Sequence, residues 1–128
     1  MRKLIKTERK IIMEKFMTIP EIIKFIENME RNSYFSLASR YLDEHNPKTA
    51  EAWWCVAKLD FGDCTNLMFD YHGGGYPHIY CIDYKSGEST IENALKNFME
   101  DNPDEFDFKE AKYVVDTTIF HFGRGVDL

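Results

Sequence analysis

The stretch of sequence that decides the fold is residues 52–84, AWWCVAKLDFGDCTNLMFDYHGGGYPHIYCIDY. Apolar and polar side chains alternate in it with a period of two, which is the spacing of a β-strand. Residues 62–66 and the glycine-rich residues 73–77 separate three such runs and are typical of turns. The stretch therefore predicts an antiparallel meander of three strands.

Matching the apolar faces of these runs predicts how the strands pair. Leu59 pairs with Phe69 and Tyr71 pairs with Ile79, because a slip of one residue would mix apolar and polar side chains on each face. Cys55 and Cys81 then share the apolar face. On the polar face this register predicts two cross-strand pairs: Lys58 opposite Asp70, and His72 opposite His78.

Before this stretch, apolar residues repeat at helical spacing in two runs. The first run begins at Thr18 and Glu21, which have the spacing of a capping box, with Pro20 in the first turn. The second run extends from Tyr34 to Leu42 with the same period and stops before a proline. These runs predict a helical hairpin that is broken near residues 31–33.

After this stretch, residues 89–92 (STIE) have the spacing of a second capping box. Ile91, Ala94, Leu95 and Phe98 follow at the spacing of one buried helical stripe. The helix is expected to end at residues 101–103. Residues 113–122 are rich in Val, Thr, Ile and Phe and predict a fourth strand.

The resulting order of elements is α-α-β-β-β-α-β, which predicts an α+β fold of two layers. Its antiparallel three- to four-stranded sheet, a β-meander, would have the helices packed on one face. A length of 128 residues suits one domain. We expect residues 1–16 to form a basic N-terminal segment, helical or partly ordered, and residues 17–128 to form a single acidic domain.

The charge of the chain is distributed unevenly. Residues 1–16 hold six Lys/Arg and two Asp/Glu, whereas residues 17–128 hold ten Lys/Arg and twenty Asp/Glu. Such an excess of carboxylates disfavours direct nucleic-acid binding, which needs cations on the protein. No apolar run approaches the ~20 residues of a membrane span, and three cysteines without a CxxC pair indicate a reducing, cytoplasmic location.

The acidic residues 100–110 are the strongest candidate for a partner-binding surface. Six carboxylates could attract a basic protein over a distance, and a phenylalanine could anchor the contact. A tyrosine at the tip of the glycine-rich hairpin would add a secondary contact. The predicted partner-binding residues are Glu100, Asp101, Asp104, Glu105, Phe106, Asp107, Phe108 and Tyr76.

A metal or acid/base site is the competing interpretation of the polar side chains. In the expected register Asp70, His72 and His78 converge on the polar face of the sheet, and carboxylate and imidazole are ligands of Zn²⁺ and similar ions. No recognised ligand spacing supports this site, and Asp70 already has Lys58 as an expected partner. The balance therefore favours a protein without a metal or other cofactor.

These observations favour a small, non-enzymatic binding protein of the inhibitor, immunity or regulatory-adaptor type. Its expected partner is a basic protein surface, such as the nucleic-acid channel of an enzyme, where carboxylates can occupy phosphate positions. Two alternatives stay open. One is a small metal-dependent or acid/base enzyme that uses Asp70, His72 and His78, and the other is a structural homodimer formed through the sheet.

Overall fold

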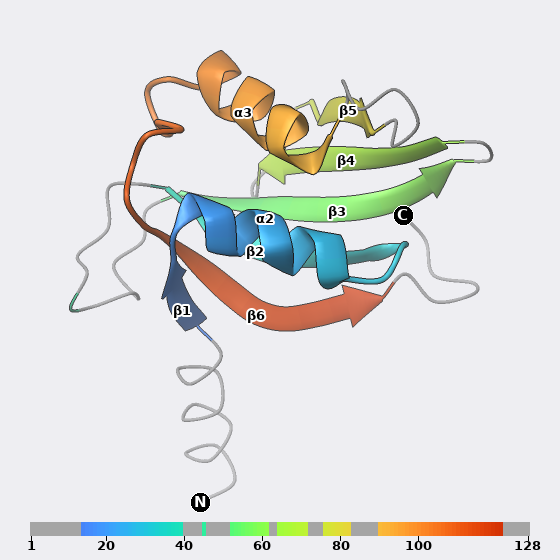
Figure 1. Cartoon of the computed structure of the whole chain (residues 1–128), viewed down its shortest axis with the longest axis horizontal. Helices are drawn as coiled ribbons and strands as arrows, with labels where there is room; N and C mark the ends of the chain where they lie inside the picture. Colours follow the sequence, from blue (N-terminus) through green and yellow to red (C-terminus); the bar gives the residue numbers. More distant parts are fainter. Residues whose placement is uncertain are drawn as a thin grey trace, which may run out of the picture.

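The computed structural model describes residues 14–39, 45, 52–61, 64–71, 76–82 and 90–121. These residues form one six-stranded antiparallel sheet and two helices. Figure 1 shows both helices lying over the sheet. In chain order the elements are β1 (Glu14–Met17), α2 (Ile19–Asn28), β2 (Ser33–Ala38), β3 (Trp53–Phe61), β4 (Cys64–Tyr71), β5 (His78–Ile82), α3 (Ile91–Asp101) and β6 (Tyr113–His121).

The predicted fold class is wrong in the number of strands and in their order. The sheet order is β1-β6-β2-β3-β4-β5, so the last strand of the chain lies between β1 and β2. The first element is the strand β1, and the strand β2 lies where the second helix was expected. The antiparallel meander of β3, β4 and β5 and the strand at residues 113–121 are confirmed.

The helix expected from Tyr34 to Leu42 is wrong, because residues 33–38 form the central strand β2. Phe35 and Leu37 are fully buried, which satisfies an alternating pattern. Tyr34, Leu37 and Ala38 also fit helical spacing, so a run of six residues cannot distinguish the two. Pairing with β3 on one side and β6 on the other decides the matter.

The expected N-terminal segment also differs from the structure. Residues 1–13 lie outside the described part of the chain, but Glu14–Met17 pairs with β6 as a strand and not as a helix. The division expected between residues 16 and 17 therefore falls inside β1. Phe16 faces Val114 in this ladder, and Met17 packs against the core.

Both described helices begin at a threonine cap. Thr18 and Glu21 form the predicted capping box, with each side chain bonded to the other residue's backbone N–H. At α3 the cap is Thr90, whose hydroxyl accepts the Asn93 N–H at 3.1 Å. The cap therefore lies one residue later than the box expected at residues 89–92, and Ser89 itself lies outside the described residues. The predicted apolar stripe of α3 is confirmed, since all of its members are buried. Neither helix, at 10 and 11 residues, is long and apolar enough to cross a membrane.

The expected register of the meander is wrong. Val56 pairs with Phe69, and Leu59 pairs with Asn66, so Leu59 and Phe69 lie on opposite faces of the sheet. Phe61 pairs with Cys64, which leaves a connection of two residues in place of the five-residue turn expected at 62–66. A shorter turn moves the pairing along the chain and exchanges the faces.

One face of the sheet packs with both helices around a single hydrophobic core. We call it the core face, and the other the opposite face. The core face carries Phe35, Leu37, Val56, Leu67 and Phe69, all fully buried. The opposite face carries Ala57, Met68 and Ile79, which alternate with core-face residues along β3, β4 and β5.

Candidate functional site

The acidic segment, residues 100–110, begins in the last turn of α3 and continues into the loop that leads to β6. The structure does not place Phe106 at its surface. Phe106 is 1% exposed, and its ring lies 5.2 Å from the ring of Phe98 and 5.5 Å from that of Tyr113. Phe108 is half-buried against the core. Phe106 therefore fixes the segment to the domain and is not an exposed anchor for a partner.

Three of the carboxylates in the acidic segment are engaged within the domain. Asp101 accepts the Tyr80 hydroxyl at 2.7 Å, and Glu105 accepts the Trp54 indole N–H at 3.3 Å. Burial and the Asp101 carboxylate raise the pKa of Tyr80, so its hydroxyl remains a donor at neutral pH. Asp107 accepts the backbone N–H of Lys109 at 2.8 Å.

Among the carboxylates of the acidic segment, those of Glu100, Asp104 and Glu110 are exposed. A groove of about 550 Å³ separates α3 from the loop, with Met99, Phe106 and Phe108 among its lining residues. Its charged lining residues carry both signs: Lys96, Glu100, Asp107 and Lys109. The groove itself is therefore close to neutral, and the exposed carboxylates provide the excess negative charge.

A cluster of rings surrounds Trp54 at the end of the sheet where α3 terminates. The Trp54 ring lies 5.2 Å from Tyr71, 5.7 Å from His78 and 4.8 Å from Phe98, in edge-to-face arrangements. Trp54 itself is 4% exposed, whereas Tyr71 is 37% exposed and His78 is half-buried. We call Tyr71, His78 and Glu105 the Trp54 rim, because each contacts Trp54 and reaches the surface.

Sequence reasoning did not find the Trp54 rim. Its residues come from β4, β5 and the loop after α3. The pairing of β3, β4 and β5 brings Tyr71 and His78 to Trp54, and the loop after α3 adds Glu105. One signal was present: consecutive tryptophans in a strand must face opposite sides. In the structure Trp54 is buried on the core face, and Trp53 is half-buried on the opposite face.

Tyr76, the predicted secondary contact, lies just before β5 and is 93% exposed. The glycines that precede it lie outside the described residues. Tyr76 is thus available at the surface, but no other described residue joins it to form a binding site.

The register error separates the residues of the expected metal site. Asp70 pairs with Cys55 on the opposite face, whereas His78 pairs with Phe69 on the core face. His72 lies outside the described residues. The described residues contain no group of three or more His, Cys, Asp or Glu that could hold a metal ion.

Lys58 is a buried lysine, and the cross-strand partner expected for it is wrong. It faces Leu67 and not Asp70 in the ladder, and it is 7% exposed. Its ammonium donates to the carbonyls of Ile26, Glu27 and Met29 at 3.1, 3.2 and 3.0 Å. These are carbonyls at the C-terminal end of α2, where helix carbonyls run out of backbone donors; the Ile26 carbonyl also accepts the N–H of the C-cap residue Met29 at 3.3 Å. Burial lowers the pKa of Lys58.

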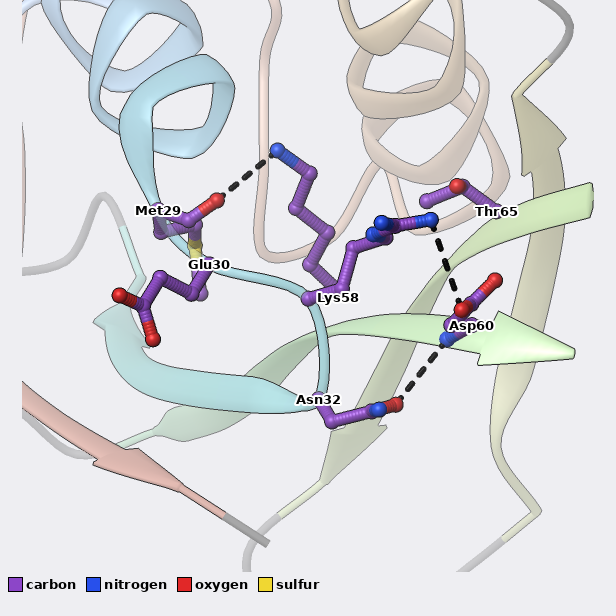
Figure 2. A pocket seen from close by; sticks show the side chains of 7 residues that line it. Met29, Glu30, Asn32, Lys58, Asp60 and Thr65 are labelled. Carbon is purple, nitrogen blue, oxygen red and sulfur yellow. Dashed lines mark hydrogen bonds and ion pairs between the residues drawn. The ribbon is translucent and has the colours of Figure 1, made fainter.

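Figure 2 shows the groove above Lys58, where Arg31 and Asp60 form an ion pair at 3.4 Å and Asn32 accepts the Asp60 N–H at 3.1 Å. Asn32 adopts a φ of 62°, which the short polar side chain tolerates at this turn. The Lys58 ammonium points toward α2 and has three acceptors already. The groove is the space where α2, β2 and β3 meet. All three N–H donors of the Lys58 ammonium are already used within the protein, so none is left for a ligand.

The three cysteines lie on the opposite face and differ in exposure. Cys81 is exposed, and Cys64 and Cys55 are half-buried, so the expected burial of Cys81 is wrong. Cys64 begins β4 and accepts the Asn66 amide at 3.5 Å. Burial, with a smaller effect of Asp70, raises the pKa of Cys55 to about 11.

We expect iodoacetamide at pH 8 to alkylate Cys81 at least ~100-fold faster than Cys55, because alkylation requires an exposed thiolate. Peptide mass spectrometry of the folded protein after timed quenching measures both rates. Unfolding in urea serves as the control and should make all three cysteines react at similar rates. Equal labelling of Cys55 and Cys81 in the folded protein would contradict the burial and the high pKa of Cys55.

No family model, curated protein or solved structure matches this chain.

Proposed function

We propose that this protein is a small, non-enzymatic binding protein that engages a basic protein surface, as an inhibitor, immunity protein or regulatory adaptor does. The observation that supports it best is the attachment of the acidic segment to the core. Phe106 is buried, and the Tyr113 hydroxyl donates to the Asp107 carbonyl at 2.7 Å and accepts the Asp107 N–H at 2.8 Å. The exposed carboxylates of the segment therefore stand on a fixed framework.

A fixed framework matters because binding is weakened by the entropy lost when a flexible segment becomes ordered. Glu100 belongs to α3, and the loop that carries Asp104 folds back through Phe106. Their charges attract a cationic surface over about a Debye length, ~10 Å at 0.1 M salt. A cytoplasmic location belongs to this proposal, since three cysteines without a CxxC pair fit a reducing compartment.

We expect Glu100→Gln with Asp104→Asn to weaken binding of a fluorescent nona-arginine peptide about fivefold at 50 mM salt, and less at 300 mM salt, since exposed charges are screened. Glu27→Gln with Glu92→Gln is the matched control, because these exposed glutamates lie outside the acidic segment and the net charge changes equally. Fluorescence anisotropy gives the Kd of each protein at both salt concentrations.

The control distinguishes a binding surface from overall charge. Equal weakening by the two double variants would mean that the peptide responds only to net charge, and the proposed surface would be abandoned. Affinity that does not change between 50 and 300 mM salt would have the same consequence.

Self-association through the sheet is a second candidate. Ile79 and Phe120 are 52% and 44% exposed. Ile79 lies on the opposite face next to its ladder partner Met68. Phe120 stacks on Tyr34 with ring centres 5.1 Å apart. Light scattering at increasing protein concentration tests this candidate, and a constant monomer mass would reject it.

A further inference from the structure

The Trp54 rim combines aromatic surface with a carboxylate in a way that selects one kind of cation. Tyr71 and His78 flank the buried indole, and the indole N–H holds the Glu105 carboxylate beside them. A Tyr or Trp ring attracts a cation placed within about 6 Å of its centre. A carboxylate next to such a ring adds a charged acceptor for the same cation.

The polar groups of the Trp54 rim have few hydrogen-bond partners among the described residues. In the described part of the chain, the Tyr71 hydroxyl and the His78 ring form no hydrogen bond, and Glu105 has the Trp54 indole as its single partner. Half-buried polar groups usually find a partner, in the protein or in water. The described residues therefore leave these three groups available to a ligand that reaches the rim.

The charges around the rim exclude anionic ligands. Asp101 and Asp104 lie in the same segment as Glu105, and each of them is exposed. A nucleotide or phosphopeptide that stacked on Tyr71 would bring its phosphates toward the Glu105 carboxylate at the same indole. The charge complementarity therefore selects a cationic side chain and not an aromatic phosphate.

We propose that the Trp54 rim receives an arginine side chain of the basic partner, which stacks on Tyr71 and donates to Glu105. This inference rests on the proposed function and names the contact that would give it specificity. Arginine suits the rim better than lysine, because a planar guanidinium stacks on a ring and donates to a carboxylate at the same time. A lysine ammonium is compact and keeps its water more strongly.

The two tryptophans provide the readout. Nona-arginine and nona-lysine peptides are titrated into ¹⁵N-labelled protein, and the two indole N–H signals are followed by NMR. We expect nona-arginine to shift the Trp54 signal and to leave the Trp53 signal in place, since Trp53 lies on the opposite face. Nona-lysine should shift the Trp54 signal less and bind about threefold more weakly or worse.

Two variants test the separate parts of the rim. Tyr71→Leu keeps an apolar side chain against Trp54 and should reduce the ratio of arginine to lysine affinity to near one. Glu105→Gln keeps an acceptor for the indole and should weaken both peptides more than Glu110→Gln, which removes an equal charge from the same segment. Urea unfolding of each variant checks that the domain remains folded.

The outcomes separate the two proposals. If Glu100→Gln with Asp104→Asn weakens nona-arginine binding but Tyr71→Leu leaves the affinity ratio unchanged, the proposed function stands and the arginine site is wrong. An unshifted Trp54 signal at saturating peptide, or equal effects of Glu105→Gln and Glu110→Gln, would also overturn the arginine site. If neither peptide binds, both proposals fail.

Discussion

Phe106→Ala is expected to lower the free energy of unfolding by about 3–5 kcal/mol, the usual cost of removing a buried phenylalanine ring. Phe106 is 1% exposed and contacts the rings of Trp54, Phe98 and Tyr113. The substitution removes this packing and leaves a cavity between α3 and the sheet. Urea denaturation followed by circular dichroism measures the loss.

The neighbouring Phe108→Ala is the matched control for Phe106→Ala. Phe108 is half-buried at the edge of the core, so we expect a loss of about 1 kcal/mol or less from its smaller buried area. A reversed order, with Phe106→Ala nearly neutral and Phe108→Ala severe, would contradict the placement of Phe106. Phe106 would then become available again as a contact for a partner.

Lys58→Met is expected to lower the free energy of unfolding by about 2–4 kcal/mol. Methionine matches the length of the aliphatic stem but has no donors, so the carbonyls of Ile26, Glu27 and Met29 lose their shared ammonium. The Ile26 carbonyl keeps the Met29 N–H at 3.3 Å, so the cost arises from the other two carbonyls, which lose a donor at the partly buried end of α2. Urea denaturation measures this change as well.

Lys24→Met serves as the control for Lys58→Met, because Lys24 is an exposed lysine on α2. A surface substitution of this kind usually changes the unfolding free energy by less than about 0.5 kcal/mol. A Lys58→Met variant as stable as Lys24→Met would show that water replaces the ammonium at the helix end. The account of the groove in Figure 2 would then need revision.

The local signals that were interpreted correctly depend on neighbours in the chain. Thr18 and Glu21 form their capping box within one turn of α2, and the apolar stripe of α3 is buried as expected. The strand at residues 113–121 follows from its β-branched composition. In each case the interactions that produce the local structure lie within a few adjacent residues.

The errors arose where distant parts of the chain decide between two local solutions. Residues 33–38 satisfy both a helical and an alternating pattern, and β3 and β6 select the strand by pairing with it on both sides. The register of the meander depended on the length of one turn, and the shift separated Asp70 from His78. The candidate metal site depended on the expected register, and in the observed register Asp70 and His78 lie on opposite faces of the sheet.

The candidate binding surface was likewise only partly predictable from the sequence. Composition indicated an acidic segment after the second helix, and the structure leaves Glu100, Asp104 and Glu110 exposed there. The burial of Phe106 and the use of Glu105 by Trp54 were not foreseeable, because no periodic pattern in residues 100–110 marks an inward side. Contacts between α3 and the sheet assign these roles.

The excess of surface carboxylates, the start of α2, the buried side of α3 and the β3–β5 meander all follow from the order of the residues. Those features arise from interactions within a turn or along one element, where spacing alone is sufficient. The position of β6 beside β2, the register and the assembly of the Trp54 rim depend instead on contacts in the folded domain. These features join residues far apart in the chain, and their selection depends on the burial of apolar surface by the whole domain.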